Sequence, residues 1–112
     1  MAQPMLLRGT LDLLLLKVLV AQPLNGFEIV RQLEDRSEGA LDIEDSALYQ
    51  ALHRLEERGF IDAEWGMSPN NRRARYYALT TRGRTHLRVE TTRWIKSAEL
   101  VALILRGATL RA

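Results

Sequence analysis

The spacing of hydrophobic residues changes twice along the chain, from helical to alternating and back to helical. Apolar side chains three and four positions apart predict four helices, over about residues 8–21, 26–36, 45–58 and 80–106. Between the last two helices, extended runs at 60–65 and 74–79 flank a polar segment rich in turn-forming residues. The predicted order is therefore three helices, a β-hairpin and a long final helix.

Capping residues stand at several of the expected helix ends. Pro23 would end the first helix, and Asn25 can cap the second, with Glu28 at the spacing of a capping box. Gly59 occupies the position where a helix C-cap favours positive φ, so the third helix would lead directly into the first strand. Thr80 or Thr81 can cap the fourth helix, which we expect to stop before Gly107.

The third predicted helix separates an apolar face from a polar one. Its leucines recur at spacings of four and three and would pack inward. The opposite face carries Ser46, Tyr49, Gln50 and His53, side chains that can contact base edges in a major groove. The alternative for Tyr49 is a half-buried aromatic that closes the core, with its hydroxyl in water. A helix with a free polar face followed by a hairpin is typical of a winged DNA-binding motif.

Three arginines gather at the tip of the predicted hairpin, beside two asparagines. Because strand residues alternate between faces, Arg73 and Arg75 would share one face, so at most two of the arginines aim alike. A charge run is usually a solvated surface, but arginines next to a groove-sized helix favour contact with phosphates or a minor groove. We therefore predict that the wing contacts DNA through Asn71, Arg72, Arg73 and Arg75.

Several of these segments resemble the PadR family of bacterial transcriptional regulators, especially its short class with one C-terminal helix. The resemblance covers the chain from about residue 6 to the last helix, and it is carried by NGFEIV at 25–30, LYQALHRLEERGFI at 48–61, NNRRARYYALT at 70–80 and Gly83. It implies a homodimeric winged helix-turn-helix repressor, often responsive to a small molecule, in which Tyr49 contacts DNA. Many members carry proline where this chain has Gln50, which leaves the base preference at that position open.

We accordingly expect an α+β fold that is mostly α: a winged helix-turn-helix over residues 1–80 and a C-terminal dimerisation helix over 81–112, packed as one compact unit. A chain of 112 residues is one domain. The expected DNA target is a double-stranded, pseudo-palindromic operator whose half-sites lie about 34–36 Å apart.

The final helix carries an apolar seam at coiled-coil spacing, and the first helix is apolar on more than one face. A chain this small cannot cover both, so we predict a homodimer, with folding of the last helix onto its own domain as the alternative. The predicted interface consists of Leu11, Leu15, Leu87, Trp94, Ala98, Val101 and Leu105. Paired Trp94 side chains could also sandwich a flat aromatic or hydrophobic effector, as the resemblance implies, whereas simple packing is the ordinary role of such a residue.

The net charge is only +2, but it is unevenly distributed. Residues 28–64 contain eleven acidic side chains against four arginines, whereas residues 72–96 contain eight basic side chains against one glutamate. Phosphate contacts depend on local positive charge, so the small net charge does not exclude DNA binding. A basic wing could instead meet an acidic protein, and a protein-binding module of this kind would lack salt-dependent, sequence-specific DNA affinity.

Other classes of protein find little support. Asp12 and Lys17 interrupt the N-terminal apolar run, which argues against a signal peptide or a membrane span. The chain has no cysteine, which is compatible with a reducing cytoplasm, where we expect it to reside. His53 and His86 have neither metal-ligand spacing nor a nucleophile elbow beside them. We therefore predict no enzymatic activity, no metal and no cofactor.

Overall fold

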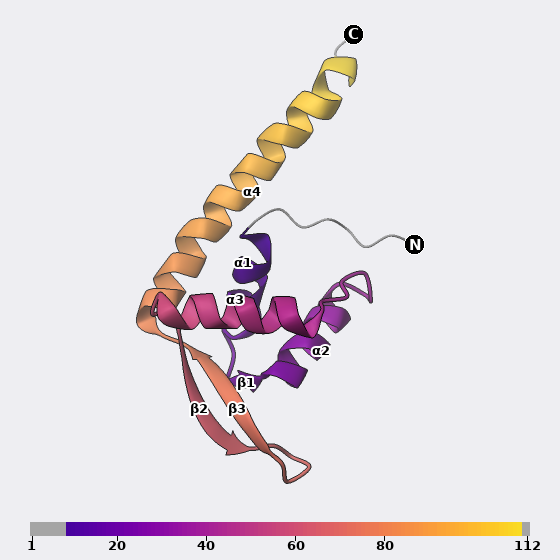
Figure 1. Cartoon of the computed structure of the whole chain (residues 1–112). Helices are drawn as coiled ribbons and strands as arrows, with labels where there is room; N and C mark the ends of the chain where they lie inside the picture. The colour runs from indigo at the N-terminus through magenta and orange to yellow at the C-terminus, as the bar shows by residue number, and fades with distance from the viewer. Residues whose placement is uncertain (1–8, 111–112) are drawn as a thin grey trace.

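The computed structural model describes residues 9–110, and its described part contains four helices and a three-stranded antiparallel sheet (Figure 1). The elements are α1 (Thr10–Val18), β1 (Leu24–Asn25), α2 (Gly26–Arg36), α3 (Asp45–Glu57), β2 (Ile61–Met67), β3 (Arg73–Leu79) and α4 (Thr81–Leu110). The expected α+β, mostly helical winged fold is confirmed. The expected start of the first helix, near Arg8, lies outside the described residues.

Three boundaries differ from the prediction. Helix α1 ends at Val18, well before Pro23, because the N–H groups of Leu19 and Val20 bond three residues back in a tight turn. Strand β1 was not predicted, since two residues carry no periodicity; it exists only through its pairing with β3. Helix α4 continues through Gly107 to Leu110, because an isolated glycine weakens a helix without ending it.

The predicted caps account for three of the helix ends. Asn25 and Glu28 form a complete capping box at the start of α2, with bonds of 2.9 and 3.0 Å between each side chain and the other residue's N–H. At the end of α3, Gly59 has φ +79° and Phe60 N–H bonds to Leu55 C=O, as in a Schellman motif. Thr80 caps α4, since its Oγ1 accepts from the N–H of Gly83 at 2.9 Å.

The core lies where α1, α2 and α3 meet the sheet. Its buried hydrophobic side chains come from every element of the winged domain and include Leu15, Leu16, Leu19, Ile29, Leu48, Leu52, Leu55, Ile61 and Tyr77. Leu15 is 0% exposed and Leu87 is 8% exposed within a single chain. Both side chains are therefore covered almost entirely by their own chain, and their place in a dimer interface stays a prediction.

Helix α4 packs its first turns against α1 and β3 and then projects away from the body (Figure 1). The radius of gyration is 16.3 Å, whereas a compact chain of this length would have a value of about 13 Å. The distal half of α4 therefore extends beyond the reach of its own domain. Within the described part of the chain, no helix combines the length and apolar character needed to cross a membrane.

Candidate nucleic-acid interface

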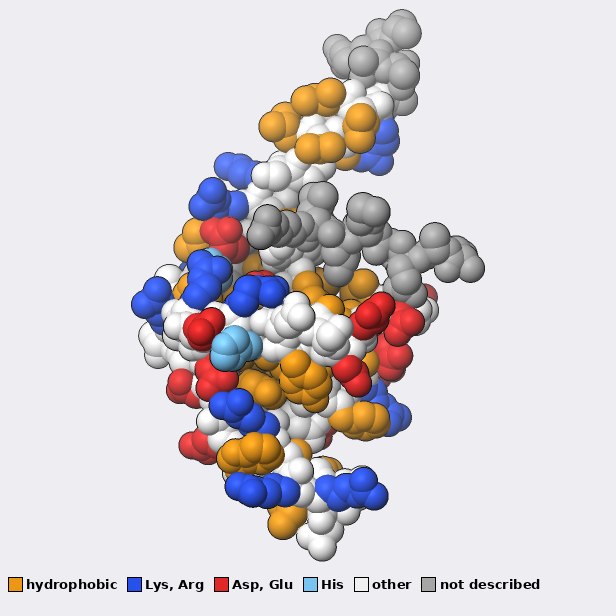
Figure 2. Space-filling view, in the orientation of Figure 1, with side chains coloured by type: hydrophobic (Ala, Val, Ile, Leu, Met, Phe, Trp, Pro, Cys, Tyr) orange, Lys and Arg blue, Asp and Glu red, His pale blue; other side chains and the backbone are white. Residues whose placement is uncertain are grey.

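A groove of about 880 Å³ lies between the start of α2, the middle of α3 and the wing formed by β2 and β3. Its walls combine aromatic and basic side chains, among them Phe27, Arg31, Tyr49, Trp65, Arg72 and Arg73. Hydrophobic and basic side chains also alternate over the wing and below α3 in the space-filling view (Figure 2). This mixture suits a partner that offers both stacked bases and phosphates.

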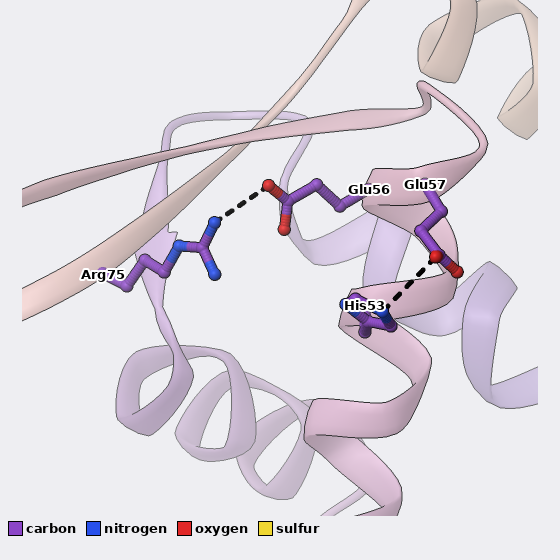
Figure 3. A network of polar contacts seen from close by, with 4 residues as sticks. All are labelled: His53, Glu56, Glu57 and Arg75. Carbon is purple, nitrogen blue, oxygen red and sulfur yellow. Dashed lines mark hydrogen bonds and ion pairs between the residues drawn. The ribbon is translucent and has the colours of Figure 1, made fainter.

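All four residues predicted to form the recognition face lie on the exposed side of α3: Ser46, Tyr49, Gln50 and His53. Their shared face follows from helical spacing, because the intervening leucines are buried. His53 Nε2 lies 3.4 Å from a carboxylate oxygen of Glu57, one turn along the same helix (Figure 3). A ligand that contacts His53 would compete with Glu57 for its imidazole, whereas Ser46, Tyr49 and Gln50 carry no charged group.

Tyr49 is 50% exposed, so it is neither a free surface residue nor part of the core. The hydroxyl end of its ring lies against Gly26, the first residue of α2. The ring is half-buried, as in the alternative raised from the sequence, but its hydroxyl lies against Gly26, and its contact with DNA stays a prediction. Its remaining exposed half lines the groove, where it can still contact DNA.

The wing tip is a tight turn built by its polar residues. Asn71 N–H bonds to Ser68 C=O at 2.9 Å, and Ser68 N–H bonds to Arg72 C=O at 2.8 Å. Pro69 fits the second position of such a turn, where its fixed φ is suitable. Asn71 itself has φ +63°, a left-handed conformation that asparagine tolerates better than most residues. The turn leads directly into Arg72 and into Arg73, the first residue of β3.

The three wing arginines have different surroundings. Arg73 lies over the Trp65 ring, with its guanidinium carbon 4.5 Å from the ring centroid. Arg75 forms a 2.9 Å ion pair with Glu56 of α3 (Figure 3). Its guanidinium carbon also lies 5.9 Å from the ring centroid of Tyr77. Arg72 is exposed at the end of the turn. As predicted from alternation, Arg73 and Arg75 share a face, and it is the face that carries the buried Tyr77.

Trp65 contributes to the wing surface, a role that was not predicted for it from the sequence. It is 61% exposed and serves as a platform for Arg73, since the register that sets Trp65 opposite Arg75 brings Arg73 to its diagonal. A tryptophan two strand positions before the turn and an arginine just after it were the available signal. Below them, burial raises the pKa of the Tyr77 hydroxyl, more than the nearby Arg75 cation lowers it.

A second groove, of about 680 Å³, runs between α1 and α4 and includes most of the residues predicted for the dimer and effector sites. Trp94 Nε1–H donates to Thr10 Oγ1 at 3.3 Å, which turns the indole toward α1 of its own chain. The side chain is 43% exposed, and Ala98, Val101 and Leu105 continue the wall. Leu11 is only partly buried against the core.

The chain is similar in sequence and in fold to known transcriptional regulators. A sequence model of the transcriptional regulator PadR-like family matches residues 15–89. A PadR family transcriptional regulator from Eggerthella lenta is 31% identical, with a TM-score of 0.75 over 88% of this chain and 84% of that one. A PadR family transcription regulator from Clostridium difficile is 25% identical, with a TM-score of 0.75 over 87% and 99% of the two chains. An uncharacterized protein of Lysinibacillus sphaericus is 26% identical over 91% of this chain and 94% of its own length.

Proposed function

Since the chain belongs to the PadR-like family of transcriptional regulators, which bind DNA, we propose that it acts as a homodimeric repressor of a pseudo-palindromic operator. Repression and release by an effector are what the family resemblance implies. A bacterial regulator of this kind would act in the cytoplasm, where the DNA lies.

One observation carries the proposal: Tyr49, on the exposed polar face of α3, and the arginines of the wing line the same groove. In this proposal α3 enters the major groove with Ser46, Tyr49, Gln50 and His53, and the amide of Gln50 can pair with adenine. The wing, through Asn71, Arg72 and Arg73, contacts flanking phosphates or the narrow minor groove. Arg75 belongs to the same set, but Glu56 competes with DNA for its guanidinium.

The distal half of α4 supports the proposed dimer. Leu103, Ile104 and Leu105 are 63–74% exposed, a run of aliphatic surface that a monomer in water rarely keeps uncovered. A second copy of the same helix is the natural cover, because a two-fold axis pairs identical apolar seams. Leu11, Trp94, Ala98 and Val101 would extend this interface toward the body. Two recognition helices could then meet half-sites about 34–36 Å apart.

The groove beside Trp94 supports the proposed effector site. Its volume of about 680 Å³ lies within the usual range for ligand pockets, and its walls are mostly apolar. A flat aromatic molecule stacked on Trp94 would touch both α1 and α4. Because α4 would also set the spacing of the two recognition helices, binding there could change the affinity for DNA.

Fluorescence anisotropy with labelled duplexes tests the proposal. The protein is titrated into DNA from upstream of its own coding sequence, into duplexes selected from a random library, and into a scrambled duplex, each at several salt concentrations. We expect tighter binding to a two-fold symmetric sequence and an affinity that falls steeply with salt. Equal, weak binding to every duplex would contradict it and favour the protein-binding module instead.

A further inference from the structure

We infer that Gly26 is a positioning residue for Tyr49: its missing Cβ leaves the space in which the tyrosine ring lies across the start of α2. The inference rests on the proposed role of Tyr49 in contacting DNA. It gives a function to a glycine that has no DNA-contacting side chain and lies 23 positions away in sequence.

Any other residue at position 26 would require the end of the Tyr49 side chain to shift. A Cβ built on Gly26 would lie 3.0 Å from Tyr49 Cζ and 3.3 Å from Cε1, and still nearer to the hydroxyl oxygen. Backbone conformation does not require glycine here, because the positive-φ glycines of the described chain are Gly9, Gly39 and Gly59. The requirement at Gly26 is therefore the space beside its Cα.

Both partners are held in place from other directions. The capping box of Asn25 and Glu28 fixes the first turn of α2, and Asn25 is also paired with Tyr76 in the sheet. On the other side, the buried Leu48 and Leu52 anchor α3 beside Tyr49. Helices α2 and α3 cannot move away from each other without losing these contacts. A methyl group added at Gly26 would therefore displace the Tyr49 ring.

Displacing the ring would change the groove itself. Tyr49 and Phe27 line the same groove wall, and the seat at Gly26 keeps the exposed half of Tyr49 in that wall. A ring turned away from this position would no longer line the groove beside the wing arginines. Free rotation also adds an entropic cost when DNA orders the side chain again.

The sign of the effect on stability distinguishes this role from ordinary packing. Alanine is the better helix former, so Gly26→Ala should stabilise α2 wherever its methyl group has room. With Tyr49 present the methyl group meets the ring, and the substitution should destabilise. In a Tyr49→Ala background the obstruction is gone, and the same substitution should become neutral or stabilising.

The experiment is a double-mutant cycle of G26A, Y49A and G26A/Y49A, read by thermal unfolding and by anisotropy on the selected operator duplex. We expect G26A to lower Tm in the wild-type background and not in Y49A. We expect it to weaken operator binding about tenfold, within the range of coupled contacts, and by less than about twofold in Y49A. The salt slope should stay unchanged, because no phosphate contact is lost.

The Y49A background serves as the matched control, since the same glycine is replaced where nothing obstructs it. Equal losses of Tm and of operator affinity in both backgrounds would overturn the inference. The unfolding half of the cycle needs no DNA, so it decides the steric coupling by itself. If that coupling appears while wild-type protein does not distinguish operator from scrambled DNA, the DNA-binding proposal fails and the seat for Tyr49 stands.

Discussion

Large hydrophobic side chains are exposed both beside the groove and on the distal half of α4, but the side chains around them differ. On the groove side, Trp65 lies beneath Arg73, and Tyr49 lies against Gly26. On the distal half of α4, Leu103, Ile104 and Leu105 form an aliphatic run. Aromatic rings mixed with cations suit a charged and hydrated partner such as DNA, whereas contiguous aliphatic surface suits another apolar surface.

The junction between the two regions is tightly built. Phe60 is stacked on His86 with ring centroids 4.1 Å apart, and Gly83 of α4 packs directly on the Phe60 carbonyl. Thr80 Oγ1 donates to Gly59 C=O at 2.7 Å and caps α4 at the same point. The start of β2 and the start of α4 are therefore held together by several close contacts.

The largest expected effect removes the aliphatic surface. V101E/L105E places charges in the proposed seam, and burial of each of these side chains contributes about 1.5–3 kcal/mol, so the dimer dissociation constant should rise by more than about 1000-fold. Sedimentation equilibrium measures this, and circular dichroism checks that the fold persists. E99Q, on the same helix, is the control. A dimer that keeps its affinity in V101E/L105E would show that α4 does not form the interface.

The next effect breaks the junction. Gly83→Ala adds a methyl group against the backbone of Phe60, which cannot move aside, and should lower the free energy of unfolding by about 2–3 kcal/mol. Urea denaturation is the measurement. Gly107→Ala is the matched control, because its Cβ would meet only a flexible Leu103 methyl group at 3.1 Å. Equal stability of the two variants would contradict the close packing at Gly83.

A smaller effect concerns the wing. Arg73→Ala should weaken binding to all duplexes about tenfold and reduce the salt slope by about one contact, since a phosphate partner is lost. Anisotropy titrations at four salt concentrations give both values. Arg36→Ala, at the far end of α2, should leave them unchanged. An unaltered slope in Arg73→Ala would remove this arginine from the phosphate contacts.

The smallest effect concerns Arg75. Its guanidinium is already paired with Glu56, and an exposed ion pair contributes about 0–1 kcal/mol, so Arg75→Ala should weaken DNA binding only a few-fold. The same titrations compare it with Arg73→Ala. A larger loss for Arg75→Ala than for Arg73→Ala would mean that DNA displaces Glu56 and takes the arginine.

Local patterns in the sequence predict much of the fold. The capping box at Asn25, the C-cap at Gly59 and the faces of α3 follow from short-range rules and are confirmed. Contacts between distant residues could not be predicted in the same way. The pairing of Arg75 with Glu56, the seat of Tyr49 on Gly26 and the short strand β1 all depend on how the elements pack.

The apolar seam shows the same limit. Spacing alone places Leu87 and Trp94 on one stripe, but the stripe crosses from the body to the projecting part of α4. Leu87 is consequently buried in the core, whereas Leu105 is 74% exposed. Only the position of α1 against the first turns of α4 determines where the core ends. Periodicity identifies an apolar face without revealing what covers it.

In the proposed complex, two α3 helices, held by paired α4 helices, bind one symmetric site. We would test this by inserting about five base pairs, half a helical turn, between the half-sites of the selected operator and repeating the anisotropy titration. The dimer cannot reach two half-sites on opposite sides of the duplex, so affinity should fall to the level of a single half-site. Unchanged affinity after the insertion would contradict a rigid dimeric reader.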